Sequence, residues 1–392
     1  MAICGDGAGF LVGICAQNAD SMTTNFLSLL IIALLSTTLS CQRSSSPLAA
    51  TSTDAVAAFD RQLDSLFHVY KLPGMSVAVV KGDSVVYKRG FGYADVEQQR
   101  PATPLTTYRV ASLTKPISAT LLLQQQEAGV LSLDDSIKQI IPGYEAYYEQ
   151  VKNYILTHAP KYAHLVEDFD YTRHDISIRH HLTHTAQHTP GDTFSYNGFL
   201  YGALSQVLAI KLQQPFEEQL QERIFSECGM TYSAPSQAYA DTTLLALPYH
   251  YLVERDTFLR SPYPSPDVNA AAGIVSNVID LAKFDNAIDH NQLIDAATQA
   301  LAWTNQRTNS GERIPYGLGW FVQSYRGQPL VWHYGWQPEA FSRLYLKVPE
   351  SDLTLIMLAN SEDLSAPFME QGYDSNVLAS PFARVFLESF VR

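Results

Sequence analysis

RVASLTKPI, residues 109–117, joins a strand-like run to a helix-like run and holds a serine three positions before a lysine, Ser112 and Lys115. Because proline is accepted only in the first turn of a helix, Pro116 predicts a helix that begins between Ser112 and Lys115. The positive end of the helix dipole would favour negative charge on Ser112. The same field disfavours the Lys115 ammonium, so a buried Lys115 could be neutral and accept the Ser112 proton. The simpler reading is a helix-capping serine and a surface lysine.

Apolar, β-rich runs lie toward both ends of the chain, at 75–96 and in the segments GLGWFVQSY, LVWHYGW, FSRLYLKVP and DLTLIMLAN between 317 and 360. Helical and loop-like sequence fills the middle. We therefore predict an α/β fold in which an antiparallel sheet is built from both termini and a helical region is inserted between them. The expected parts are an α/β domain at 55–135 and 265–392 and a helical region at 136–264, with a Tyr-rich insertion at 144–174.

Composition limits the function. The chain has 392 residues, 46% of them hydrophobic, and a formal net charge of −13, so it can bury a large core but offers no basic surface for nucleic acid. FLSLLIIALL (26–35) is too short to span a bilayer and resembles the apolar part of an export signal. We expect residues 1–41 to be a leader, Cys41 a lipidation site that tethers the protein to a membrane, and 42–54 a linker. This predicts an exported protein, periplasmic or membrane-anchored.

Further segments follow the Ser-x-x-Lys pair in a fixed order. They are ISIRHHLTHTA (176–186), PGDTFSYNGFLYGALSQVL (190–208), AAAGIVSNVIDLAKF, YGLGW, HYGW and LYLKVPESDLTLIMLAN. Together with RVASLTKPI, this series resembles the serine β-lactamase and penicillin-binding-protein superfamily, and within it the class C branch of β-lactamases, DD-peptidases and esterases. The resemblance covers residues 55 to 365 and implies a β-lactamase-like sandwich.

The resemblance also implies roles for the matched residues. Ser112 would be the acylated nucleophile and Lys115 its partner, and Tyr196 would move the proton between serine and leaving group. His333 would supply a donor or positive potential near the substrate, and Gly335 would let its strand approach closely. The main-chain N–H groups of Ser112 and Trp336 would form the oxyanion hole. Taken singly, Tyr196 and His333 could equally be packed core residues.

The sequence departs from the family pattern at Gly198, which stands where the Tyr-x-Asn motif has the asparagine that holds the substrate's amide. A short loop precedes Tyr196, and the 144–174 insertion could form a wall or lid. We therefore expect a serine hydrolase that acts on an ester or amide, as an esterase or peptidase rather than an efficient β-lactamase. The alternatives are a D-Ala-D-Ala-type peptidase or penicillin-binding protein and a catalytically silent binding relative. No cofactor or metal is implied, and the oligomeric state is open.

Five histidines form a competing pattern. They lie at His174, His180, His181, His184 and His188, and three of them are spaced four apart. On one helix face, three imidazoles could bind zinc. No carboxylate or cysteine stands at ligand spacing beside them, and His184 matches a family histidine without a metal role.

Overall fold

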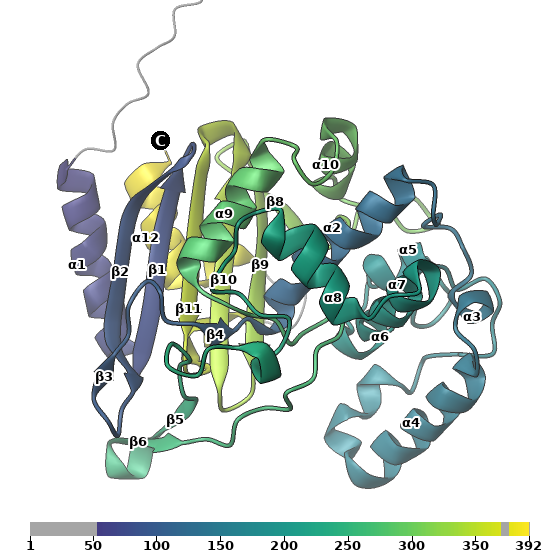
Figure 1. The fold of residues 1–392 in the computed structure, drawn as a ribbon, viewed down its shortest axis with the longest axis horizontal. Helices are drawn as coiled ribbons and strands as arrows, with labels where there is room; N and C mark the ends of the chain where they lie inside the picture. Colours follow the sequence, from purple (N-terminus) through teal and green to yellow (C-terminus); the bar gives the residue numbers. More distant parts are fainter. Residues whose placement is uncertain (1–52, 370–375, 392) are drawn as a thin grey trace, which may run out of the picture. The chain divides into compact units, whose positions relative to one another are not determined.

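The fold is described from a computed structural model, which covers residues 53–369 and 376–391. Its centre is one seven-stranded sheet in the order β3-β2-β1-β11-β10-β9-β8, in which every neighbouring pair is antiparallel (Figure 1). The strands span Gly74–Lys81 (β1), Ser84–Asp95 (β2), Arg100–Pro101 (β3), Phe321–Tyr325 (β8), Gln328–Gln337 (β9), Phe341–Val348 (β10) and Leu353–Ala359 (β11). Strand β1 pairs directly with β11, which confirms the predicted sheet built from both ends of the sequence.

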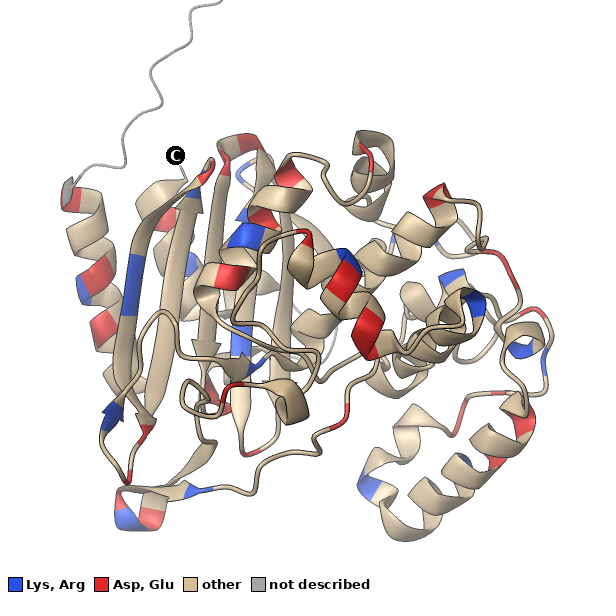
Figure 2. Ribbon diagram, viewed as in Figure 1, with Lys and Arg blue, Asp and Glu red and all other residues tan. Residues whose placement is uncertain are grey.

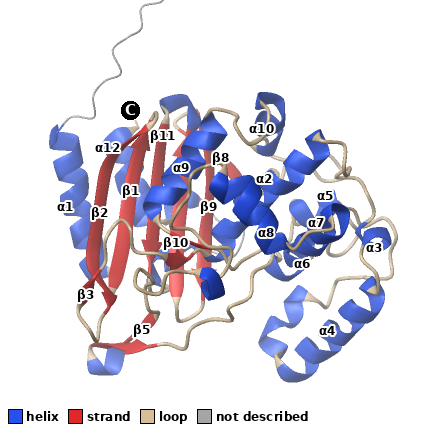
Figure 3. Cartoon of the chain, viewed as in Figure 1, coloured by secondary structure: helices blue, strands red, loops and turns tan. Residues whose placement is uncertain are grey.

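Helices cover both faces of this sheet (Figure 3). On one face, α1 (Thr53–Val69) packs beside α12 (Pro381–Phe390), and Phe59 of α1 meets Phe386 and Phe390 of α12. On the other face, α9 (Val278–Asp289) contacts β1 and β11. The central strands are therefore apolar on both sides, and all seven residues of β11 are buried.

The inserted region consists mainly of short helices. These are α3 (Ile137–Ile140), α4 (Tyr144–His158), α5 (Ile178–Leu182), α6 (Gly198–Gly202), α7 (Leu204–Leu212) and α8 (Phe216–Leu220). The prediction of a helical and loop-like region missed one feature, a hairpin of β5 (Tyr249–Leu252) and β6 (Thr257–Arg260). The Tyr-rich insertion forms α4 and a 3₁₀ segment, Pro160–Leu165. In Figure 2, acidic and basic residues are interspersed on α1 and α4.

The short strands β4 (Tyr108–Arg109) and β7 (Val275–Ser276) pair with each other. A 3₁₀ turn, Ala111–Leu113, leads into α2 (Thr114–Glu127). Two further short helices are α10 (Ala296–Ala302) and α11 (Ala366–Met369). The expected leader with Cys41 and nearly all of the expected linker lie outside the described residues. No helix among the described residues is long and apolar enough to cross a membrane.

Candidate active site

Ser112 and Lys115 lie at the start of α2, as the position of Pro116 predicts. Ser112 occupies the 3₁₀ turn, and Pro116 is the third residue of α2, so it removes no helical hydrogen bond. The serine does not cap the helix: the residue at the N-cap is Leu113, and no side chain caps this end. Instead, the Oγ of Ser112 lies 3.0 Å from the Nζ of Lys115. Ala111, just before Ser112, has a φ of 41°, a strained conformation for a residue with a Cβ.

Lys115 is buried among neutral groups. Its Nζ donates to the main-chain oxygen of Ala271 at 3.3 Å, and it forms no ion pair with any described carboxylate. The aromatic faces of Tyr196 and Tyr201 lie 4.9 and 5.5 Å from this nitrogen. Burial lowers the pKa of Lys115 to about 7. A substantial share of the lysine is therefore neutral near physiological pH and able to accept a proton.

Tyr196 stands beside this pair on the segment that leads into α6. Its ring packs at a tilt against His184, 4.3 Å between centroids, and stacks on Phe321 at 5.7 Å. The imidazole of His184 accepts a hydrogen bond from the main-chain N–H of Asn197 through Nδ1, at 3.0 Å. This packing fixes the Tyr196 ring next to Lys115. No sequence pattern indicates this supporting role of His184, because its contacts are made by residues far apart in the chain.

Gly335 brings β9 against the turn that carries the nucleophile. A Cβ on Gly335 would lie 2.9 Å from the main-chain oxygen of Val110 and 3.3 Å from the main-chain nitrogen of Ser112. Only glycine permits this approach. The next residue, Trp336, lines the same cavity as Ser112, and its indole N–H donates to Glu362 at 3.0 Å.

His333 differs from its expected role. The side chain is fully buried and does not line the cavity. Its Nδ1 donates to the main-chain oxygen of Tyr334 at 2.6 Å, so its Nε2 accepts from the hydroxyl of Tyr316 at 2.9 Å. Burial lowers the pKa of His333 to about 3, so the ring is neutral. It therefore supplies no positive potential, and its geometry orients Tyr316, a residue that the sequence did not single out.

A cavity of about 160 Å³ opens beside the nucleophile. It is lined by Ser112, Tyr162, His164, Leu165, Tyr196, Gly198, Phe199, Tyr334 and Trp336. Three of these residues, Tyr162, His164 and Leu165, belong to the 144–174 insertion, which thus forms one wall. A Cβ on Gly198 would lie 3.5 Å from the Nζ of Lys115, an ordinary contact distance, so this position lies directly beside the lysine.

The insertion is held in place by the loop that carries Tyr196. The side-chain amide of Asn197 donates to the main-chain oxygen of Leu165 and to Gln187 Oε1, both at 2.8 Å, and Gln187 donates to the main-chain oxygen of His164 at 2.9 Å. The Oδ1 of Asn197 caps α6 by accepting from Leu200. Asn197, the residue between Tyr196 and Gly198, is therefore used in the structure as an anchor and a helix cap.

Comparisons with known proteins identify the family of this chain. The family described as "Beta-lactamase" matches residues 59–374, most of the chain. The chain belongs to the beta-lactamase family. This confirms the resemblance given by the ordered motifs.

Several individual relatives are similar over much of this beta-lactamase-family chain. Penicillin-binding protein 4* of Bacillus subtilis (strain 168) is 24% identical over 74% of the chain, and the putative penicillin-binding protein PbpX of the same organism is 26% identical over 62%. Protein flp of Staphylococcus aureus (strain MW2) is 22% identical over 78%. The chain spans 68%, 61% and 63% of these relatives, respectively.

Solved structures confirm the fold. The octameric penicillin-binding protein homologue from Pyrococcus abyssi has a TM-score of 0.65 at 22% identity, over 79% of this chain and 74% of that one. A penicillin-binding protein from Bacillus halodurans has a TM-score of 0.59 at 18% identity, over 79% of this chain and 98% of that one. The predicted sandwich of the beta-lactamase family is therefore present.

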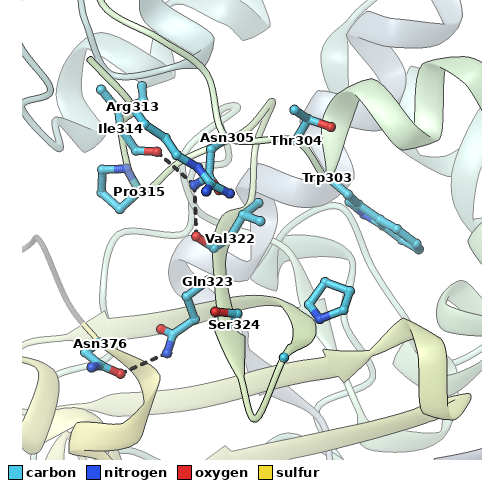
Figure 4. A pocket seen from close by; sticks show the side chains of 12 residues that line it. Trp303, Thr304, Asn305, Arg313, Ile314, Pro315, Val322, Gln323, Ser324 and Asn376 are labelled. Atoms are coloured by element: carbon cyan, nitrogen blue, oxygen red, sulfur yellow. Dashed lines mark hydrogen bonds between the residues drawn. The ribbon is translucent and has the colours of Figure 1, made fainter.

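A larger hollow of about 730 Å³ lies elsewhere in this family member, beside β8 and the segment after α10 (Figure 4). Polar side chains that line it form hydrogen bonds within the protein. Asn305 donates to the main-chain oxygens of Ile314 and Val322, and Gln323 donates to Asn376. No serine–lysine pair lines it.

The histidines spaced four apart do not lie on one helix face. Helix α5 ends at Leu182, and His184 and His188 have positive φ angles, so the four-residue spacing is not helical there. His180 instead accepts from the main-chain N–H of Ser177, and His181 donates to the main-chain oxygen of Leu200. Within residues 53–369 and 376–391, no group of three or more histidine, cysteine or acidic side chains is placed to hold a metal ion.

Proposed function

We propose that this chain is a serine hydrolase that forms an acyl-enzyme on Ser112 with a small ester or amide substrate, as an esterase or peptidase rather than an efficient β-lactamase. The observation that carries the proposal is the 3.0 Å separation between the Ser112 Oγ and a Lys115 Nζ that is buried without a counter-charge among the described residues. A capping serine beside a surface lysine would show neither feature.

In the acylation step, the Ser112 oxygen attacks the substrate's carbonyl carbon while its proton passes to the Lys115–Tyr196 pair. The tetrahedral intermediate carries the charge on the former carbonyl oxygen, which the N–H groups of Ser112 and Trp336 would bind. When the intermediate collapses, the bond to the leaving group breaks, and the leaving group takes the proton from the same pair. Because the Lys115 Nζ lies 4.9 Å from the centroid of the Tyr196 ring, we assign the base to the pair.

Deacylation repeats the sequence with water. A water molecule attacks the acyl carbon and gives a proton to the same pair, and the bond to Ser112 Oγ breaks as that oxygen recovers a proton. The products are a carboxylic acid and free enzyme. Of the residues used in these steps, Ser112, Tyr196 and Trp336 line the cavity, and the Lys115 Nζ lies 3.0 Å from the Ser112 Oγ.

The walls of the cavity favour a small, largely apolar acyl group. Aromatic rings from Tyr162, Phe199, Tyr334 and Trp336 surround it, and its volume of about 160 Å³ holds only a short acyl chain. Gly198, at the position of the family's asparagine, adds no polar group, and the amide of the neighbouring Asn197 binds the main-chain oxygen of Leu165. A site without that polar contact discriminates poorly for the acylamino group of a penicillin.

Steady-state kinetics with three substrate types test this proposal. We expect p-nitrophenyl acetate or butyrate to be hydrolysed with a higher kcat/KM than a penicillin, and all activity to disappear in Ser112→Ala. Preferential hydrolysis of a D-Ala-D-Ala peptide would favour the peptidase alternative, which the names of the penicillin-binding relatives also suggest. Absence of turnover with all three would favour a binding role.

A further inference from the structure

Two arginine side chains are buried behind the nucleophile turn. Arg343 on β10 is 0% exposed, and Arg109 on β4 is 6% exposed. Within the described part of the chain, the three guanidinium nitrogens of Arg343 have no hydrogen-bond partner. The Nε and Nη1 of Arg109 also have none there. The remaining nitrogen of Arg109 donates to the main-chain oxygen of Asp267 at 3.1 Å. Buried polar groups in folded proteins are nearly always satisfied, so these donors require an explanation.

The residues around this pair do not supply a counter-charge. No described carboxylate forms a salt bridge with either arginine. Asp267 acts on Arg109 only at longer range, and its own carboxylate is exposed and accepts from Ser265. The hydroxyl of Tyr108 is engaged with Ser76 at 2.8 Å. Burial raises the pKa of Tyr263, so this side chain is a neutral phenol.

Tyr263 adds a further donor at the same place. Its hydroxyl is buried and has no partner among the described residues. Its ring packs on Phe341 at 5.4 Å, and the guanidinium carbon of Arg343 lies 5.1 Å from the centroid of the same Phe341 ring. The phenol and the two guanidinium groups thus share one buried neighbourhood, in which the two positive charges repel each other.

Loss of a proton does not remove the positive charge of either buried arginine. The guanidinium group stays protonated in proteins, even though burial lowers the pKa of Arg343 well below its usual value. An unpaired buried charge costs several kcal/mol. Water could satisfy individual N–H groups, but it carries no charge to offset two cations. An anion would satisfy both the N–H donors and the charge.

We propose that Arg109 and Arg343, with the hydroxyl of Tyr263, hold a small inorganic anion of the size of chloride as a permanent part of the fold. Neither arginine lines the substrate cavity, and Arg343 is closed to solvent, so the bound species is resident and not a carboxylate of the substrate. Chloride fits because it is compact, monovalent and able to accept several hydrogen bonds.

The position of this site gives it a consequence for the nucleophile. The point where a Cβ of Gly335 would lie is 2.8 Å from Cδ of Arg343 and 3.3 Å from the main-chain nitrogen of Ser112. Arg109 precedes Ser112 by three residues. A bound anion would therefore fasten β10 to the segment that carries the nucleophile, and its loss would loosen the turn at Ala111–Leu113.

Two measurements on the whole protein test the site. Crystals grown in sodium bromide should give an anomalous peak between Arg109 and Arg343. Thermal unfolding at constant ionic strength, with sodium chloride progressively replacing sodium gluconate, should show a saturable rise in Tm of roughly 2 to 4 °C. Gluconate is too large to enter a closed site.

Two variants distinguish chloride binding at this site from a general effect of salt on stability. Arg343→Met should abolish the chloride-dependent rise. Arg89→Met, which removes surface ion pairs with Asp60 and Asp64, should retain it. If Arg343→Met does not fold, the bromide peak in the wild type decides. A water molecule in place of bromide, or an equal chloride response in Arg343→Met and the wild type, would overturn the proposal.

Discussion

The Nζ of Lys115 lies 3.0 Å from the Oγ of Ser112, and no described carboxylate pairs with it. A lysine in such surroundings is held by neutral acceptors and aromatic faces, so its proton is weakly bound.

The rate of ester hydrolysis should depend on the protonation of Lys115. With a pKa of about 7, the neutral base form predominates above that pH. We expect kcat/KM for p-nitrophenyl acetate to rise through about pH 7 and then to level off. Lys115→Arg, whose side chain stays charged, should lower the plateau by about 10²- to 10⁴-fold. A pH-independent kcat/KM between pH 5.5 and 8.5 would contradict this role.

The burial of Lys115 should also lower the free energy of unfolding of the protein. Its pKa is lowered in the folded state, to about 7 from a normal 10.5, so the folded protein binds this proton less tightly than the unfolded chain does. The penalty is full below about pH 7 and disappears as the pH rises toward 10.5. Lys115→Met should therefore stabilise the protein by about 1 to 3 kcal/mol at pH 6 and by less at pH 9.

Denaturant unfolding at the two pH values measures this difference. Lys88→Met, at an exposed position on β2, is the matched control and should show no comparable pH-dependent gain. If Lys115→Met were less stable than the wild type at pH 6, the buried ammonium would not carry the predicted cost.

Gly198→Asn should shift the substrate preference. The Cβ position on Gly198 has ordinary contact distance to Lys115, so the side chain can be added without a backbone clash, and its amide would enter the cavity. We expect acylation by a penicillin to accelerate by about tenfold and ester hydrolysis to decrease. Gly198→Ala, which adds only the Cβ, should not accelerate penicillin acylation. Equal effects of the two substitutions would exclude a role for the amide.

The insertion should control the fit of the acyl group. Gln187→Leu removes the hydrogen bonds to His164 and Asn197, each worth about 0.5 to 1.5 kcal/mol, without touching the cavity. We expect KM for p-nitrophenyl butyrate to rise by roughly 3- to 10-fold while kcat changes little. The exposed Gln206→Leu serves as the control. If KM is unchanged in Gln187→Leu, the anchoring of the insertion does not contribute to substrate binding.

The sequence predicted the sheet and the start of α2 well, because both depend on local patterns. Apolar strand runs at the two ends of the chain pair as expected between β1 and β11, and the restriction on Pro116 places Ser112 at the helix start. The charge state of His333 could not be read in this way. Its neutrality comes from burial and from Tyr316, which lies 17 residues earlier and is brought to it by the fold.

From the sequence, the 144–174 insertion could be a wall or a lid, and the residues that line the cavity could not be named. Residues 162–165 have no pattern that points to a site, and they reach the cavity because Asn197 and Gln187 bind their main-chain oxygens. The use of Asn197 as an anchor and helix cap is likewise a tertiary property. Such roles depend on which distant segments meet, and a single sequence does not encode them in a readable local pattern.

The role of Ser112 is tested most directly by intact-mass analysis after treatment with a fluorophosphonate. We predict one covalent adduct on the wild type, assigned to Ser112 by peptide mapping, and none on Ser112→Ala that retains the wild-type circular dichroism spectrum. An unmodified wild type, or an adduct that persists in Ser112→Ala, would contradict the assignment of Ser112 as the nucleophile.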